Sequence, residues 1–311
     1  MTSIEAVSSY LPAASVPVAD FLRAHGMTDA RIRVHERFFG FSRVPMDPAT
    51  TQADHLVAAI NGLDDLDTLR PRIRYVLQAR TMPVAVPYPV NPLQEACRRT
   101  GLTDATAFCL TQHACASGLL AIDVAGRLLA SDGDPEALAL IVAGEKTFTS
   151  AAQVINDTGV MGEASSAALV SAGGSRDRVL SYATRTHGKF HGGAWLEAEM
   201  NAAFHDEYAG SLAEVMTAAT ESAGLTMDDM ALILPHNVNR MSWLRVLKLL
   251  GVKGTDRLYL ETLADHGHCF GADAFINYRS ALDAERLRPG ERYLMTAVGL
   301  GATFSAMVLE H

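Results

Sequence analysis

Short runs of apolar residues alternate along the chain with longer alanine-rich stretches, and this alternation predicts a mixed α/β protein. The apolar runs have the length of buried strands and are bounded by glycine or polar residues. Strands are predicted at residues 139–143, 167–171, 230–234, 293–298 and 305–309. Helices are predicted at residues 116–131, 209–223, 239–250 and 271–284. We therefore expect a sheet covered by helices rather than a β-sandwich or a helical bundle.

The predicted helices are of two kinds. The helix at 116–131 has apolar residues nearly all round and is expected to be buried, whereas residues 210–223 and 274–286 mix polar and apolar positions as outer helices do. A turn-like segment follows residue 171, and we place a boundary there between halves at residues 1–174 and 175–311. Each half contains one segment that runs from apolar strand through glycine to polar turn, which is consistent with a duplication.

Composition and charge narrow the class of protein. The chain has 311 residues, of which 49% are hydrophobic, so it can form a large core. Lys and Arg total 26 against 35 Asp and Glu, and the net charge of -9 argues against a general binder of nucleic acids or anionic membranes. No CxxC pair, no signal-like start and no apolar run of about 20 residues are evident, so a reduced, cytoplasmic protein is expected.

Cys115 is the strongest candidate for a reactive side chain. It stands at the start of the predicted buried helix, where the helix dipole and unpaired backbone N–H groups favour thiolate over thiol. Small residues on both sides leave room for a substrate to approach. The alternative is a buried, inert cysteine, which is how we interpret Cys97 and Cys109.

Three turns downstream carry further candidate groups. His236 follows a predicted strand, at a strand-to-helix turn where α/β proteins hold catalytic residues. His268 lies in a short polar turn before another predicted helix. Gly299 and Gly301 join two apolar strands, and bare backbone there can come close to a ligand. A thiol, two imidazoles and a glycine turn are the parts needed for acyl transfer through a thioester.

Four short motifs occur in an order that resembles the ketosynthase III branch of the thiolase superfamily, the condensing enzymes of fatty-acid and polyketide synthesis. They are Ala-Cys-Ala-Ser-Gly from residue 114, Pro-His-Asn-Val-Asn from residue 235, His-Gly-His-Cys-Phe-Gly from residue 266 and Gly-Leu-Gly-Ala-Thr from residue 299. No single motif is specific, but their order and gaps make a joint signal. The resemblance extends from Ser9 to the end of the chain.

The resemblance implies a thiolase-like α/β fold of two pseudo-equivalent halves, stacked as αβαβα layers, and a homodimer with paired central sheets. It assigns Cys115 as the acyl-accepting nucleophile and His236 as the first active-site imidazole. It places Asn239 near His236, where it orients a loop or a water. Backbone N–H groups of Cys115 and of the turn with Gly299 and Gly301 are expected to hold the oxyanion.

One departure from the family is that His268 takes the position of its usual Asn, which gives a Cys-His-His set. In decarboxylative condensation both side chains donate hydrogen bonds to the thioester oxygen of the malonyl unit, and a neutral imidazole can do so. An imidazole can also deprotonate an alcohol or amine, which Asn cannot. Ketosynthase III-like acyltransferases of secondary metabolism, which this chain resembles, work in that second way.

A second departure concerns the acyl donor. Family members that use coenzyme A hold its adenine with a Trp and an Arg, and no Trp precedes His35. A donor bound to an acyl carrier protein therefore fits better, and Arg240, Arg245 and Lys248 are predicted to receive this acidic partner. The alternative is a solvated face of an ordinary surface helix. No cofactor is expected beyond the thioester of the carrier protein or of coenzyme A.

The sequence thus predicts a cytoplasmic homodimeric acyltransferase that passes an acyl group through Cys115 to a small alcohol or amine in secondary metabolism. Decarboxylative Claisen condensation with a malonyl thioester is the first alternative, with His236 and His268 stabilising the enolate. An inactive partner subunit is an alternative of another class. A metal-dependent hydrolase built on the turn at His266 is a further one, although we expect no metal because the turn lacks an evident acidic partner.

Overall fold

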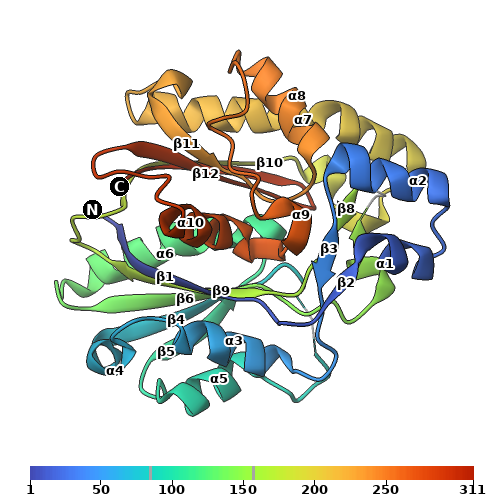
Figure 1. The fold of residues 1–311 in the computed structure, drawn as a ribbon. Coiled ribbons are helices and arrows are strands. Elements are labelled where there is room, and N and C mark those ends of the chain that lie inside the picture. The colour runs from blue at the N-terminus through green and yellow to red at the C-terminus, as the bar shows by residue number, and fades with distance from the viewer. Residues whose placement is uncertain (84–85, 156–157) are drawn as a thin grey trace.

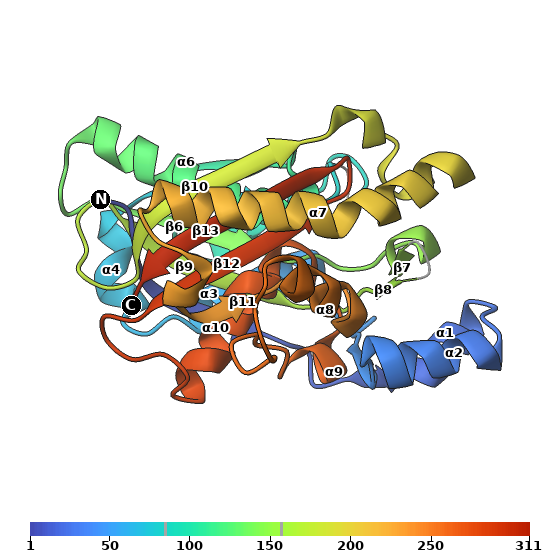
Figure 2. The same cartoon turned by 90° about the horizontal axis from the view of Figure 1, so that it is seen from above.

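The computed structural model describes residues 1–83, 86–155 and 158–311, and its helices and strands stack as layers (Figures 1 and 2). The first half-sheet consists of β1 (Ser3–Tyr10), β4 (Ile73–Ala79), β5 (Thr106–Leu110), β6 (Leu138–Ala143) and β9 (Ser165–Ser171). The second consists of β10 (Arg178–Thr186), β11 (Met230–Leu234), β12 (Arg292–Gly299) and β13 (Thr303–Glu310). The half-sheets meet where Ser3 of β1 pairs with Arg178 of β10.

The two halves repeat one topology. The first half-sheet has the order β5-β4-β6-β9-β1 and the second has β11-β12-β13-β10. In the first, β4 runs parallel to β6 and the next two pairings are antiparallel; in the second, β11 runs parallel to β12 and the next two pairings are again antiparallel. The counterpart of β5 is reduced to a single parallel bridge between Ile233 and Leu258. The fold is therefore the α/β arrangement of two pseudo-equivalent halves, and the turn between β9 and β10 contains residues 174 and 175.

The long helices form three layers around these half-sheets (Figure 1). The inner layer contains α6 (Ser117–Asp132) and α10 (Asp273–Asp283), which pack against strands of both half-sheets. Helices α3 (Gln52–Asn61) and α5 (Pro92–Thr100) cover the first half-sheet, and α7 (Ala198–Ser222) covers the second with α8 (Arg240–Leu249) beside it. Alternating layers of helix and sheet result, with hydrophobic cores on both faces of each half-sheet.

The prediction of an outer helix at residues 274–286 is wrong, because α10 lies in the inner layer and most of it is buried. Its polar side chains are satisfied inside the protein. Asn277 donates to the carbonyl of Pro235 at 2.6 Å, and the hydroxyl of Tyr278 donates to Asp177 at 2.5 Å. A helix with such partners can be buried without an apolar surface all round.

The expectation that no apolar run is long enough to span a bilayer is also wrong, as helix α6 and the turn before it show. Residues Ala114–Asp132 are long and apolar enough to do so by length and composition, and 56% of this stretch is buried inside the protein. In the fold this helix packs between the two half-sheets (Figure 1). Its apolar composition is accounted for by that position, since a helix buried on several sides needs few polar residues.

The remaining elements are short and lie mainly at one end of the layers (Figure 2). They are β2 (Ser15–Pro17), α1 (Val18–Ala24), α2 (Asp29–Val34), β3 (Arg43–Pro45), α4 (Leu66–Leu69), β7 (Val154–Ile155), β8 (Gly159–Val160) and α9 (Leu263–His266). A π-helix, His35–Phe39, continues α2. The 3-10 turns are Arg70–Arg72, Ala114–Ala116, Ser150–Ala152, Gly188–Phe190, Gly193–Trp195, Met227–Asp229 and Phe270–Ala272.

Candidate active site

Cys115 lies at the carboxyl end of the first half-sheet, in a single turn of 3-10 helix that leads directly into α6. Its side chain is buried, with 3% of the residue exposed. The hydroxyl of Thr81 donates to Cys115 Sγ at 3.5 Å. The residue thus stands where the sequence predicted it, at the amino end of the buried helix. Cys109, which was expected to be buried, is exposed because it lies on the edge strand β5.

His268 is held by a carboxylate that the sequence analysis did not identify. Its Nδ1 contacts the carboxylate of Asp273 in the first turn of α10, and both side chains are buried. Burial alone would lower the pKa of His268, but the negative charges of Asp273 and of the Cys115 thiolate outweigh it and raise the pKa to about 10. At neutral pH the imidazole is therefore protonated, with the carboxylate of Asp273 against its Nδ1 and Cys115 beside it.

Asp273 also joins the two histidine-bearing turns. Its carboxylate accepts hydrogen bonds from the backbone N–H of Asn237 at 2.6 Å and of Cys269 at 2.7 Å. Asn237 is the neighbour of His236, and Cys269 is the neighbour of His268. One buried side chain thus fixes both imidazoles relative to each other, and their ring centroids lie 5.9 Å apart.

The pKa of His236 is shifted in the opposite direction from that of His268. Burial and the positive charge of His268 lower the pKa of His236 well below its usual value, so this imidazole is neutral. Its Nε2 lies 2.5 Å from the hydroxyl of Tyr208, which comes from α7. Its backbone carbonyl accepts a hydrogen bond from the indole N–H of Trp243 at 2.9 Å, and this contact anchors the turn to α8.

A cavity of about 70 Å³ opens at these groups. Cys115, His236 and His268 all line it, together with Tyr208, Phe204, Leu300, Arg245, Ile155 and Thr158. Arg245 and Lys248 are exposed on α8, and Arg240 donates to the backbone carbonyl of Arg37 at 2.6 Å. Of the three predicted docking residues, Arg245 lines the cavity, whereas Arg240 and Lys248 lie on the same helix outside its lining.

Two predicted positioning elements contact the site in different ways. Asn239 does not line the cavity; its side chain accepts from the N–H of Ser242 at 2.8 Å, at the start of α8, and donates to the carbonyl of Thr158 at 3.2 Å. Gly299 packs against the turn that carries Cys115, and a Cβ there would lie 1.9 Å from the carbonyl oxygen of His113. Glycine is required at that position because the two backbones touch.

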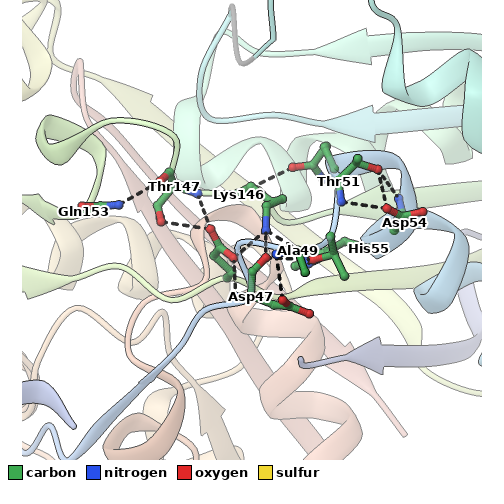
Figure 3. Close-up of polar contacts among 11 residues, drawn as sticks. Asp47, Ala49, Thr51, Asp54, His55, Lys146, Thr147 and Gln153 are labelled. Atoms are coloured by element: carbon green, nitrogen blue, oxygen red, sulfur yellow. Dashed lines mark hydrogen bonds and ion pairs between the residues drawn. The ribbon is translucent and has the colours of Figure 1, made fainter. Parts of the chain in front are cut away.

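A largely buried polar cluster surrounds Lys146 (Figure 3). Lys146 Nζ donates to the carbonyl of Asp47 at 2.6 Å and to Glu163 at 2.8 Å. Glu163 accepts in turn from the N–H and hydroxyl of Thr147, both at 3.2 Å. Burial and the charge of Lys146 lower the pKa of nearby His55 to about 4. The cluster is internally paired, so we interpret it as structural.

Glu145 is a second buried carboxylate near the nucleophile. It accepts from the backbone N–H groups of Thr81 and Met82 at 3.2 Å and so fixes the segment whose Thr81 hydroxyl contacts Cys115. Burial raises the pKa of Glu145 to about 7 despite these N–H groups and the nearby Arg80. Within the described ranges, His, Cys, Asp and Glu form no group of three or more that could hold a metal ion.

Comparison with known proteins supports one family throughout. The family described as "3-Oxoacyl-[acyl-carrier-protein (ACP)] synthase III C terminal" matches residues 220–311. The β-ketoacyl-[acyl-carrier-protein] synthase III of Ruegeria sp. (strain TM1040) is 25% identical over 96% of both chains. The chain is thus similar to β-ketoacyl-[acyl-carrier-protein] synthase III proteins along nearly its whole length. The match covers both halves, so it includes the segments that carry Cys115, His236 and His268.

Solved structures agree with this ketosynthase III-like fold. The 3-oxoacyl-[acyl-carrier-protein] synthase III from Aquifex aeolicus VF5 superposes with a TM-score of 0.84 at 16% identity, over all of both chains. ChlB3, which is described as an acyltransferase, also gives a TM-score of 0.84, at 19% identity over 99% of this chain and 97% of its own. At these identities the ketosynthase III-like chain shares the fold with both.

Proposed function

We propose that this chain is an acyltransferase that carries an acyl group from a carrier-protein or coenzyme A thioester through Cys115 to an alcohol or amine. The contact of His268 Nδ1 with buried Asp273, beside Cys115, is the observation that carries the proposal. A nucleophile, an imidazole and an orienting carboxylate are the parts that let a histidine release and take up a proton in turn. The structural similarity to ChlB3, an acyltransferase, supports the same reaction class.

In the first half-reaction the Cys115 thiolate attacks the carbonyl carbon of the donor thioester. The bond from that carbon to the donor sulfur breaks, and the leaving thiolate takes the proton from His268. Backbone N–H groups of Cys115 and of the turn with Gly299 and Gly301 hold the oxyanion. The N–H of Ala302, at the end of this turn, already donates to the carbonyl of His187 at 3.3 Å. The N–H that holds the oxyanion therefore comes from an earlier residue of the turn.

In the second half-reaction His268 acts in the opposite sense. Acylation removes the thiolate charge, which is one cause of the raised pKa of His268, so this pKa falls and the neutral imidazole left after proton loss is favoured. It takes the proton of the acceptor hydroxyl or amine as the acceptor attacks the acyl carbon. The bond from that carbon to Cys115 breaks, and the thiolate–imidazolium pair forms again.

Decarboxylative condensation is the second candidate, and the names of the curated relatives favour it, since they are β-ketoacyl synthases. To separate the two reactions, acyl-enzyme is isolated and given either a malonyl thioester or a panel of alcohols and amines. We expect esters or amides as the main products. Release of carbon dioxide with a β-ketoacyl product as the main reaction would contradict the proposed transfer to a heteroatom. An inactive partner subunit would form no acyl-enzyme at all.

We also propose that the chain acts as a cytoplasmic homodimer that receives an acidic acyl carrier protein at Arg240, Arg245 and Lys248. Strand β5 is an edge of the sheet, and its unpaired backbone groups can pair with β5 of a second copy. Light scattering is expected to give twice the chain mass of 33.3 kDa, and a monomer would contradict the dimer. The four cysteines are all unpaired, which fits a reducing compartment.

A further inference from the structure

The hydroxyl of Tyr208 forms a hydrogen bond with Nε2 of His236 at the cavity wall. Tyr208 extends from α7 to the cavity, and its oxygen lies 2.5 Å from His236 Nε2. A ring nitrogen of imidazole has a single in-plane position for a hydrogen bond, which it uses either to donate or to accept. Whichever partner supplies the hydrogen, Nε2 has no second bond left for a substrate.

Neither group is charged at neutral pH. Burial, and the charge of the Cys115 thiolate, raise the pKa of Tyr208, whereas burial and the charge of His268 lower the pKa of His236. The pair is therefore a neutral hydroxyl against a neutral imidazole. The tyrosine ring is held on two sides, with centroids 5.7 Å from that of Phe204 and 6.0 Å from that of Phe304. This packing keeps the hydroxyl directed at His236.

The hydrogen bond at His236 Nε2 affects whether the acyl-enzyme undergoes condensation or transfers its acyl group to an alcohol or amine. In condensation, the bond from the malonyl unit to its carboxylate breaks, carbon dioxide leaves, and the electron pair forms a thioester enolate that attacks the acyl carbon on Cys115. The enolate oxygen needs N–H donors at the moment it forms. With Nε2 of His236 engaged and its Nδ1 buried, His268 is the imidazole left to donate to the enolate oxygen.

We propose that Tyr208 determines which acceptor the acyl-enzyme uses. Its hydroxyl is hydrogen-bonded to Nε2 of His236, and this prevents His236 from donating to the oxygen of a malonyl thioester. This inference rests on the proposed transfer to an alcohol or amine. Such an acceptor needs one base, His268 with Asp273, and does not require His236 Nε2. Tyr208 thus determines specificity by disfavouring condensation with a malonyl thioester.

The test uses isolated acyl-enzyme of the wild type and of Tyr208→Phe, in equal amounts, mixed with a malonyl thioester. Phenylalanine keeps the ring between Phe204 and Phe304 and removes only the hydroxyl. Carbon dioxide release from the variant is expected to rise about tenfold, which corresponds to one recovered hydrogen bond in the transition state. Adding His236→Ala to this variant is expected to abolish the gain. Tyr208→Met, which also lacks the hydroxyl, serves if the first variant does not fold.

Tyr182→Phe is the matched control, because it removes another half-buried hydroxyl, 3.4 Å from Ser305 Oγ and outside the cavity lining. Its carbon dioxide release should equal that of the wild type. Unchanged or lower release from Tyr208→Phe, with ester or amide formation by the wild type intact, would overturn the role of Tyr208 alone. Efficient β-ketoacyl synthesis by the wild type itself would overturn the proposed function as well.

Discussion

Asp273 is the residue whose charge sets the state of the site. It contacts His268 directly and accepts two backbone N–H groups, so it cannot move without disturbing both histidine turns. Its negative charge is what offsets the cost of burying a protonated imidazole. The protonated imidazole lies beside Cys115 and can stabilise negative charge that develops there.

Replacing this carboxylate tests the charge directly. In Asp273→Asn the burial of His268 remains but one anionic partner is lost, so the pKa of His268 falls from about 10 and the imidazole becomes neutral at pH 7.5. We expect alkylation of Cys115 by iodoacetamide at that pH to slow about tenfold, because the adjacent imidazolium that favours a reactive thiolate is lost. The rate is measured on the Cys115 peptide by mass spectrometry.

Two controls accompany this measurement. The exposed Cys109 is an internal reference whose alkylation should not change. Asp265→Asn removes an exposed carboxylate close to His268 in sequence and should leave the rate at Cys115 unaltered. An undiminished rate at Cys115 in Asp273→Asn would show that Asp273 does not support the thiolate–imidazolium pair.

Gly299 allows a second residue-level prediction. Gly299→Ala forces a Cβ to within 1.9 Å of the carbonyl oxygen of His113, so the turn and the segment before Cys115 must separate. We expect a loss of about 1–3 kcal/mol in the free energy of unfolding, measured with urea. Gly188→Ala, where nothing lies within 4 Å of an added Cβ, should cost far less. Equal stability of the two variants would contradict the close approach.

At the level of elements, the site is assembled from turns at the carboxyl ends of strands and from the first turns of helices. The 3-10 turn with Cys115 precedes α6, the turn with His236 follows β11, and Asp273 begins α10. These elements belong to both halves of the fold. The inner helices therefore bring the nucleophile of one half to the imidazoles of the other.

Asn239 links one of these helices to the cavity wall. Asn239→Ala removes the side-chain acceptor for the N–H of Ser242 at the start of α8, and we expect a loss of about 1 kcal/mol in the free energy of unfolding. Asn239→Asp keeps that acceptor but loses the donor to Thr158, so it should recover most of the stability. Urea denaturation measures both. If the two variants were equally destabilised, the capping bond would not be the stabilising contact.

Local patterns predict those parts of the site that depend on local sequence. Cys115, His236 and His268 stand at turns between an apolar run and a helix, and the structure brings all three to one cavity. Asp273 was missed because an acidic residue in the first turn of a helix is ordinary; its spacing of five residues after His268 was the available signal. Tyr208 gave no signal, because only the packing of α7 against the second half-sheet brings it to His236.

The elements show the same limit. The five predicted strands are the apolar ones, and each is present as β6, β9, β11, β12 or β13. Strands β1, β4 and β10 each contain charged residues, and they and the short β5 were not predicted. Helix α7 begins at Ala198, well before the predicted residue 209, because its first turns pack Phe204 into the second core although charged and polar residues interrupt their sequence.

Positively charged side chains lie near the cavity, although the net charge of the whole chain is negative. The chain carries a net charge of -9, yet Arg245 at the cavity wall and Lys248 one turn further along α8 are both exposed. An acidic carrier protein would be repelled by the molecule as a whole and attracted to this face. The position of these cations beside the cavity is what makes them candidates for docking.

Reversing one of these charges tests the docking surface. Lys248→Glu is expected to lower kcat/KM for an acyl-carrier-protein donor about threefold to tenfold, because electrostatic steering of the acidic partner is lost. The same variant should retain its kcat/KM for a small acyl thioester, which does not need that surface. Arg288→Glu changes an exposed charge elsewhere and should affect neither donor. An equal loss with both donors would contradict docking at Lys248.

The central claim is that Cys115 accepts the acyl group, and intact-mass spectrometry tests it most directly. Wild-type protein, Cys115→Ala and Cys269→Ala are incubated with a panel of acyl thioesters on carrier protein and coenzyme A. We predict that at least one donor adds the mass of its acyl group to the wild type and to Cys269→Ala, that the modified peptide contains Cys115, and that Cys115→Ala stays unmodified. An adduct that persists in Cys115→Ala, or no adduct from any donor, would contradict the role of Cys115 as the nucleophile.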